Sequence, residues 1–86
     1  MKYKVIISNS AEKELSKLPK EVILKIKQKV IQLADNPFIS GYKQLKGSQD
    51  KFYRIRVGNY RIIYSVQNNE LIITIIKIGH RREIYD

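Results

Sequence analysis

One β-hairpin constrains the fold of this chain more than any other feature of its sequence. Residues 52–57 and 60–66 both alternate between apolar and polar side chains, and the pair Gly58-Asn59 separates them. Alternation of this kind is typical of strands that bury one face, and Gly-Asn between two such strands indicates a two-residue turn. A turn of this length also sets the register, because each residue before it pairs with the matching residue after it.

The hairpin register brings arginines together on one face. It pairs Arg56 with Arg61 across the two strands, and Arg54 shares their face because side chains alternate along a strand. Like charges in direct cross-strand register destabilise a hairpin by a few tenths to about 1 kcal/mol. Bound phosphates would cancel this repulsion, so we interpret the face as a site for a polyanion. The other face is apolar and is expected to meet the helices: Tyr53, Ile55, Val57, Tyr60, Ile62 and Tyr64.

A structural role for the three arginines stays open, in which they pair with carboxylates such as Glu70 or Asp50 or keep an exposed face soluble. Lysine dominates elsewhere in the chain, so the local switch to arginine favours the anion site, because a guanidinium can bind phosphate through two parallel hydrogen bonds. The net charge of +9, from 17 Lys and Arg against 8 Asp and Glu, also attracts polyanions. A Lys-rich solubilising surface would give the same net charge, so the argument depends on where the arginines lie.

The rest of the chain predicts an α+β domain. Residues 3–7 suit a first strand, and apolar side chains at helical spacing predict two helices, roughly residues 9–18 and 20–35. Asn9 is the expected N-cap of the first helix. A β-branched run over residues 71–78 predicts the final strand. The order strand, helix, helix and then an antiparallel β-meander predicts two helices packed on one face of a sheet.

The remaining segments and the composition predict a single small domain, residues 1–86. Residues 38–51 predict a loop or a short edge strand, and Asn68-Asn69 predicts a second tight turn. The absence of cysteine excludes disulfides and thiolate metal sites and fits a reducing compartment. The apolar run at the N-terminus is too short for a signal peptide or a membrane span. We therefore expect a cytoplasmic protein.

A second cluster of candidate functional residues follows Gly79: His80, Arg81, Arg82 and Tyr85. Extending the alternation of the last strand puts His80 on the arginine face. A lone histidine is usually a surface residue, and a tyrosine near a terminus usually packs on the core. Their proximity to two further arginines favours a functional role for both.

Three segments resemble the RelE/ParE superfamily of toxins: residues 44–47 (QLKG), 53–64 (YRIRVGNYRIIY) and 79–85 (GHRREIY). The similarity spans nearly the whole chain and implies a RelE-like fold. In the RelE branch, it implies a toxin that enters the ribosomal A site and cuts messenger RNA, with no metal or cofactor. The cut is made by attack of a ribose 2′-hydroxyl on the adjacent phosphate.

The resemblance implies catalytic roles for Arg56, Arg61, His80, Arg81 and Tyr85, and nucleic-acid contacts for Lys46, Arg54 and Arg82. In this scheme Arg61 stabilises the phosphorane, and Arg56 acts on the phosphate or the nucleophile side. Arg81 neutralises the leaving oxygen, and Tyr85 stacks on a base. Arginine stays charged and is a poor proton acceptor, whereas lysine is common in the family at the two strand positions. The choice of arginine therefore makes His80 a candidate general base.

The resemblance also implies the partners: an acidic, RelB-like antitoxin that covers the basic cluster, the ribosome and messenger RNA. The chief alternative is the ParE branch, which has the same fold and inhibits DNA gyrase by protein–protein contact without nuclease activity. A degenerate, toxin-like binding module also stays open. A generic RNA-binding domain fits the charge but leaves the family-like C-terminus unexplained.

Overall fold

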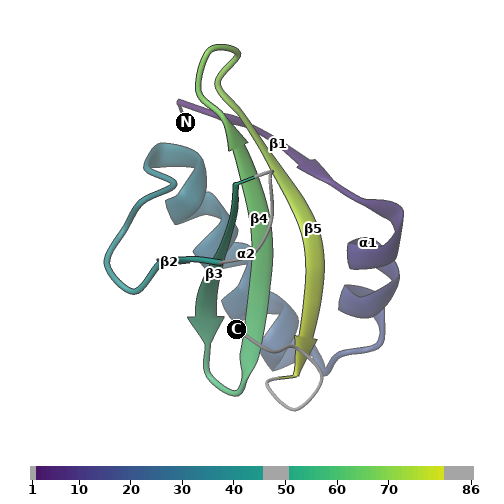
Figure 1. Cartoon of the computed structure of the whole chain (residues 1–86). Helices are drawn as coiled ribbons and strands as arrows, with labels where there is room; N and C mark the ends of the chain where they lie inside the picture. The colour runs from purple at the N-terminus through teal and green to yellow at the C-terminus, as the bar shows by residue number, and fades with distance from the viewer. Residues whose placement is uncertain (1, 46–50, 81–86) are drawn as a thin grey trace.

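One mixed β-sheet with two helices on one face forms the fold. The computed structural model describes residues 2–45 and 51–80 (Figure 1). The elements in chain order are β1 (Lys4–Ile7), α1 (Asn9–Ser16), α2 (Lys20–Asp35), β2 (Lys43–Gln44), β3 (Phe52–Val57), β4 (Tyr60–Gln67) and β5 (Ile72–His80). The strand order is β1-β5-β4-β3-β2. The predicted α+β class and the order of elements are confirmed, and β2 is the short edge strand foreseen within residues 38–51.

The sheet is mixed because its first strand returns to lie beside its last. β1 runs parallel to β5, whereas the other neighbouring strands pair antiparallel. α1 packs along β5, and α2 reaches both β1 and β3. The core between the helices and the sheet includes Ala11 of α1, Ile26 and Leu33 of α2, and Ile62 and Ile75 of the sheet. Neither helix of the described ranges is long and apolar enough to cross a membrane.

The first helix begins at residue 9 as predicted, but its N-cap is Ser8 and not Asn9. The Ser8 hydroxyl oxygen accepts a hydrogen bond of 3.1 Å from the amide of Ala11, which satisfies one of the free N–H groups at a helix start. The same hydroxyl donates to the carbonyl of Ile76 in β5 at 2.9 Å. Ser8 therefore caps α1 and also ties it to the sheet.

The hairpin register agrees with the prediction residue for residue. Arg56 pairs with Arg61, and Val57 pairs with Tyr60. Gly58 has a φ of 59°, and Asn59 is not among the residues with positive φ. A positive φ at the first central residue only is the pattern of a type II′ turn, which favours glycine there. The apolar face is buried as expected, with Ile55, Val57, Ile62 and Tyr64 all in the core.

The turn between β4 and β5 is longer than the predicted two residues. Gln67 pairs with Ile72, so four residues lie between the strands. Leu71 occupies the left-handed region with a φ of 55°, which an L-residue with a Cβ normally avoids. In this position its carbonyl accepts a hydrogen bond of 2.8 Å from the Lys4 amide. The longer turn therefore connects to the first residue of β1, a contact between distant segments that the local pattern does not reveal.

A register shift interrupts the pairing of β4 with β5. Ile63 pairs with Lys77, whereas the next residue, Tyr64, pairs with Ile75. Ile76 is therefore an extra residue on β5, as in a β-bulge. Because side chains alternate along a strand, one extra residue exchanges the two faces for everything that follows it.

Tyr64 anchors the loop after α2 to the sheet. Its side chain is fully buried, and its hydroxyl donates a hydrogen bond of 2.6 Å to the carbonyl of Pro37. The rings of Phe38, Tyr42 and Tyr53 form a chain of contacts beside it. Burial raises the pKa of the Tyr64 hydroxyl well above its usual value, so the group stays protonated and remains a donor. This anchor fixes the segment that leads into the edge strand β2.

Candidate nucleic-acid interface

Four cationic side chains cluster on β2, β3 and β4, on the face of the sheet that is turned away from the helices. Arg56 of β3 and Arg61 of β4 are direct cross-strand partners. Arg54 precedes Arg56 by two residues and so shares its face, and Lys43 of β2 is the cross-strand partner of Arg54. We call Lys43, Arg54, Arg56 and Arg61 the basic face. Direct partners have Cβ atoms about 5 Å apart, so this face holds two adjacent pairs of like charge.

The members of the basic face differ in exposure. Arg56 and Lys43 are exposed and Arg61 is half-buried, but Arg54 keeps only 4% of its side chain exposed. The expectation of three open arginines is therefore wrong for Arg54. A buried guanidinium has lost most of its hydration, which strengthens its electrostatic action on a neighbouring anion. Arg54 acts from beneath the surface, whereas Arg56 and Lys43 can meet a ligand directly.

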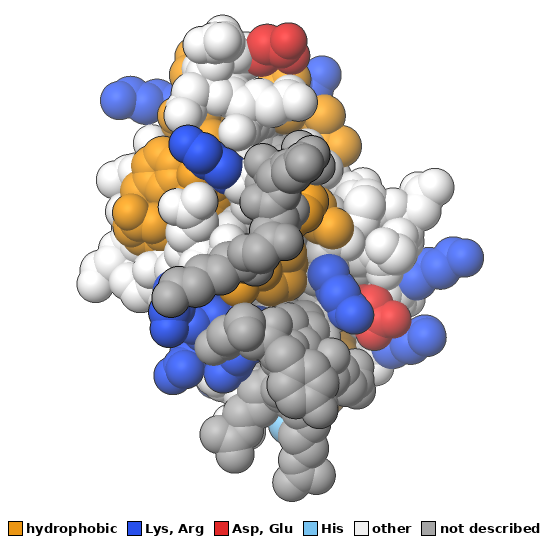
Figure 2. Space-filling view, viewed as in Figure 1, with side chains coloured by type: hydrophobic (Ala, Val, Ile, Leu, Met, Phe, Trp, Pro, Cys, Tyr) orange, Lys and Arg blue, Asp and Glu red, His pale blue; other side chains and the backbone are white. Residues whose placement is uncertain are grey.

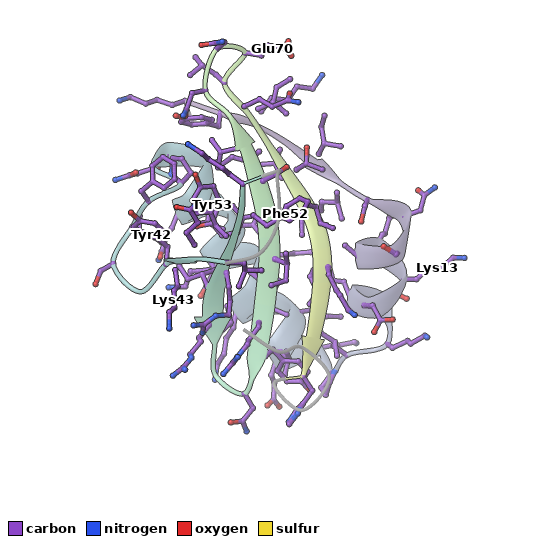
Figure 3. All side chains as sticks on the ribbon, viewed as in Figure 1. Lys13, Tyr42, Lys43, Phe52, Tyr53 and Glu70 are labelled. Carbon is purple, nitrogen blue, oxygen red and sulfur yellow. The ribbon has the colours of Figure 1, made fainter. Side chains whose placement is uncertain are left out.

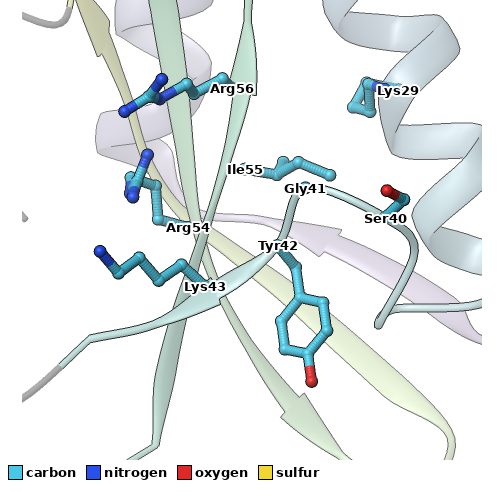
Figure 4. A pocket seen from close by; sticks show the side chains of 8 residues that line it. All are labelled: Lys29, Ser40, Gly41, Tyr42, Lys43, Arg54, Ile55 and Arg56. Carbon is cyan, nitrogen blue, oxygen red and sulfur yellow. The ribbon is translucent and has the colours of Figure 1, made fainter.

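A hollow of about 300 Å³ lies at the β2–β3 edge beside the basic face (Figure 4). Its lining consists of Lys29, Ser40, Gly41, Tyr42, Lys43, Arg54, Ile55 and Arg56. Figure 4 shows Lys43, Arg54 and Arg56 directed to one side of the strands, with Lys29 across from them on α2. Four lining side chains are cationic, and none of those within residues 2–45 and 51–80 is acidic. The hollow therefore suits an anion.

The surface view places this charge in context. Lys and Arg side chains gather at the lower left of Figure 2, over the region that β2 and β3 occupy in Figure 1. The acidic side chains visible in this view lie elsewhere, near the top and at the right. Among the described residues in this view, the side chains at the lower left that carry charge are thus all cationic.

Glu70, one carboxylate considered as a partner for the arginines, lies at the wrong end of the sheet. It belongs to the β4–β5 turn at the top of Figure 3, whereas the Gly58-Asn59 turn is at the opposite end of β4. β4 runs from Tyr60 to Gln67, and at about 3.4 Å per residue its ends are roughly 20 Å apart. Pairing of Glu70 with Arg61 is therefore ruled out, while Asp50 lies outside the described residues.

His80 lies on the opposite face from the arginines, so its predicted placement is wrong. It pairs with Tyr60 across β4 and β5, and the two rings make an edge contact with centroids 5.4 Å apart. The register shift at Ile76 is the cause, because it turns Ile78 and His80 toward the helix side and leaves Lys77 and Gly79 on the other. The imidazole is half-buried at the end of the sheet.

Four predicted site residues lie outside the described residues: Lys46, Arg81, Arg82 and Tyr85. The structure adds two cations that the sequence reasoning did not select, Lys43 and Lys29. The signal for Lys43 was weak, because it required pairing a two-residue edge strand with β3. Lys29 lies on α2, outside the hairpin and the C-terminal segment from which the candidate residues were taken.

The architecture is that of the RelE-like toxins. A chain in the crystal structure of the archaeal RelE–RelB complex from Pyrococcus horikoshii OT3 superposes on this one with a TM-score of 0.84 and 32% identity, covering 98% of this chain and 100% of that chain. The family model described as the ParE toxin of the type II toxin–antitoxin system, parDE, matches residues 5–85. The chain belongs to this toxin family.

Individual relatives indicate the branch. The protein named RelE1 in Methanocaldococcus jannaschii is 38% identical over 88 residues, which cover 99% of this chain and 97% of the relative. The mRNA interferase toxin RelE of Escherichia coli K12 is 30% identical over 88 residues, covering 99% of this chain and 92% of the relative. The chain is thus a RelE-like member of the RelE/ParE superfamily, as the sequence predicted.

Proposed function

We propose that this protein is the toxin of a type II toxin–antitoxin system and cleaves messenger RNA on the ribosome. One observation carries the proposal: Arg56 and Arg61 are direct cross-strand partners on a sheet face beside a hollow whose described lining residues include four cations and no carboxylate. This arrangement costs stability and suits a phosphate that lies between two guanidiniums. The name of the E. coli relative, an mRNA interferase toxin, supports the same activity.

The reaction follows from where charge develops. The ribose 2′-oxygen attacks the adjacent phosphorus, and the bond to the 5′-oxygen of the next nucleotide breaks, leaving a cyclic phosphate and a new 5′-hydroxyl. Negative charge grows on the phosphorane oxygens, where fixed guanidiniums stabilise it. Arg61 is half-buried and therefore well held, so we assign it to the phosphorane. The exposed Arg56 acts on the phosphate or the nucleophile side.

The remaining candidate residues take the other roles in the reaction. Arg81 is assigned to the leaving 5′-oxygen and Tyr85 to base stacking, as the family resemblance implies, while Lys46, Arg54 and Arg82 hold the backbone. His80 can reach the reacting groups only around the end of the sheet, because it lies on the other face from Arg61. The role of His80 as general base is therefore the least supported of these assignments.

The proposal includes an acidic antitoxin and action in the cytoplasm, where the ribosomes are. The P. horikoshii relative was crystallised with RelB, and a partner rich in carboxylates would neutralise the basic face.

A second feature of the surface, an apolar groove, also suits a protein partner. An apolar groove of about 250 Å³ runs between the helices and β1, with Ile7 and Ile31 exposed at 39% and 54% on its walls. Exposed apolar surface of this kind is typical of protein contacts.

The rival function is inhibition of DNA gyrase, since the matching family model carries the ParE description. A gyrase inhibitor that acts by protein contact has no need for paired arginines at a phosphate site. Wild-type protein that blocks supercoiling and leaves messages intact would establish the rival.

The decisive experiment compares wild-type protein with Arg61→Lys on programmed ribosomes, with cleavage mapped by primer extension. Lysine keeps the charge but lacks the planar two-point geometry, so cleavage should fall about 100-fold while ribosome binding barely changes. Lys4→Ala is the control, because Lys4 is exposed on β1 at the far edge of the sheet. Equal cleavage by Arg61→Lys and wild type would show that this face contributes charge alone.

A further inference from the structure

The hollow at the β2–β3 edge carries two cations that the proposed reaction does not use. Lys43 is exposed on β2, opposite Arg54, and Lys29 is half-buried on α2 at the other side of the hollow. Neither belongs to the hairpin that holds Arg56 and Arg61. These two cations lie beside that hairpin and could bind a further anionic group.

The cation pairs of the basic face are spaced along β3 like the phosphates of a nucleic-acid strand. The pair Lys43–Arg54 lies one step along β3 from the pair Arg56–Arg61, since Arg54 and Arg56 are two residues apart. Two residues of a strand span about 6.6–6.8 Å, a distance comparable to the separation of successive phosphates in an extended single strand. A strand with one phosphate between Arg56 and Arg61 therefore brings the next phosphate to Lys43.

We propose that this hollow is a second phosphate subsite, which holds the RNA backbone one nucleotide away from the cleaved linkage. Lys43 contacts the phosphate, and the buried Arg54 adds its charge from below. The inference rests on the proposed function and extends it to residues outside the hairpin. It makes Lys43 a positioning residue for the substrate.

A repeating anion fits the site better than the scattered carboxylates of a protein. Two like-charged pairs stand in adjacent registers, and like charges directly opposite each other across two strands repel. Regularly spaced phosphates relieve both repulsions at once. Phosphate contacts fix position and carry no base information, so Lys43 should aid binding of all sequences equally.

The first test is the salt dependence of RNA binding, for which cleavage is not required. A single-stranded 2′-O-methyl RNA oligonucleotide, which cannot be cut, is titrated with wild type, Lys43→Ala and the control Lys4→Ala across a range of salt. Lys4 also lies on the face turned from the helices and is exposed, but on the opposite edge strand. Loss of one phosphate contact should reduce the slope of log K against log salt by about 0.7 for Lys43→Ala only.

The second test locates the phosphate. Synthetic messages carry one neutral methylphosphonate, moved stepwise along the linkages around the cut, and are cleaved on programmed ribosomes. Wild type should lose about tenfold in kcat/KM, mainly through KM, at the linkage next to the cut. Lys43→Ala should lose nothing further at that linkage, because the contact is already gone.

Each outcome has a definite meaning. Equal salt slopes for Lys43→Ala and Lys4→Ala would overturn the subsite. Weakened antitoxin binding by Lys43→Ala with unchanged RNA binding would also overturn it and assign the hollow to the partner protein. Wild type that cuts no message, with the difference in salt slopes intact, would refute the nuclease activity and leave the phosphate subsite standing.

Discussion

Reversing the charge of Arg56 should make this protein more stable and, at the same time, inactive. Arg56 is exposed and directly opposite Arg61, so Arg56→Glu replaces a repulsion by an attraction. Arg56→Gln removes the repulsion alone and serves as the matched control. We expect stability to rise in the order wild type, Gln, Glu, while cleavage falls for both variants.

The magnitude follows from the cross-strand geometry. Removing a like-charge pair recovers a few tenths to about 1 kcal/mol, and an opposite-charge pair adds a similar amount. A total near 1 kcal/mol shifts the melting temperature of a domain of this size by roughly 4–8 °C. The effect depends on salt, because the Debye length shrinks from about 10 Å at 0.1 M to about 3 Å at 1 M.

The assay is thermal unfolding followed by circular dichroism at low and high salt, with cleavage measured on the same samples. The three melting temperatures should separate at low salt and converge at 1 M salt. Two results would refute the inferred repulsion between Arg56 and Arg61. One is a melting temperature of Arg56→Glu no higher than that of wild type at low salt. The other is an order of melting temperatures that persists unchanged at 1 M salt.

Three further predictions follow from particular contacts. Tyr64→Phe removes the buried hydrogen bond to Pro37 and should lower the free energy of unfolding by about 1–3 kcal/mol in urea titrations, whereas Tyr42→Phe at an exposed ring should have little effect. In Gly58→Ala the added Cβ contacts no neighbouring atom, but alanine must adopt a φ of 59°. The free energy of unfolding should therefore fall by at least about 1 kcal/mol in thermal unfolding, while the sheet still forms. His80→Gln should reduce cleavage less than about tenfold, because the imidazole faces away from the arginines. The pH profile of cleavage near neutrality should stay unchanged. A 100-fold loss of cleavage would instead support His80 as the general base.

Local sequence pattern was sufficient for the parts of the fold that depend on near neighbours. The two-residue turn at Gly58-Asn59 is closed by adjacent residues, so it determines the pairing of Arg56 with Arg61 without help from the rest of the chain. The helix positions also follow from local apolar spacing, although the N-cap moved to Ser8 because that hydroxyl has a second partner in β5.

The site residues also differ in whether local sequence pattern was sufficient to identify them. Arg56 and Arg61 could be identified from alternation alone. Arg81 and Tyr85 became candidates through their clustering after Gly79, and their roles were assigned only through the resemblance to the RelE/ParE superfamily. Lys43 could not be identified, because a two-residue strand has too little pattern to reveal its partner.

Sequence by itself therefore determined the hairpin, its two faces and the family of this protein. Tertiary structure alone decided that β1 lies parallel to β5, that Arg54 is buried, and that Lys43 stands opposite it. It also decided the face of His80, since the extra residue Ile76 shifts the pairing of β5. The physical reason is one of range: alternation and turns record interactions between neighbours in the chain, whereas strand order, bulges and burial depend on packing between segments far apart in it.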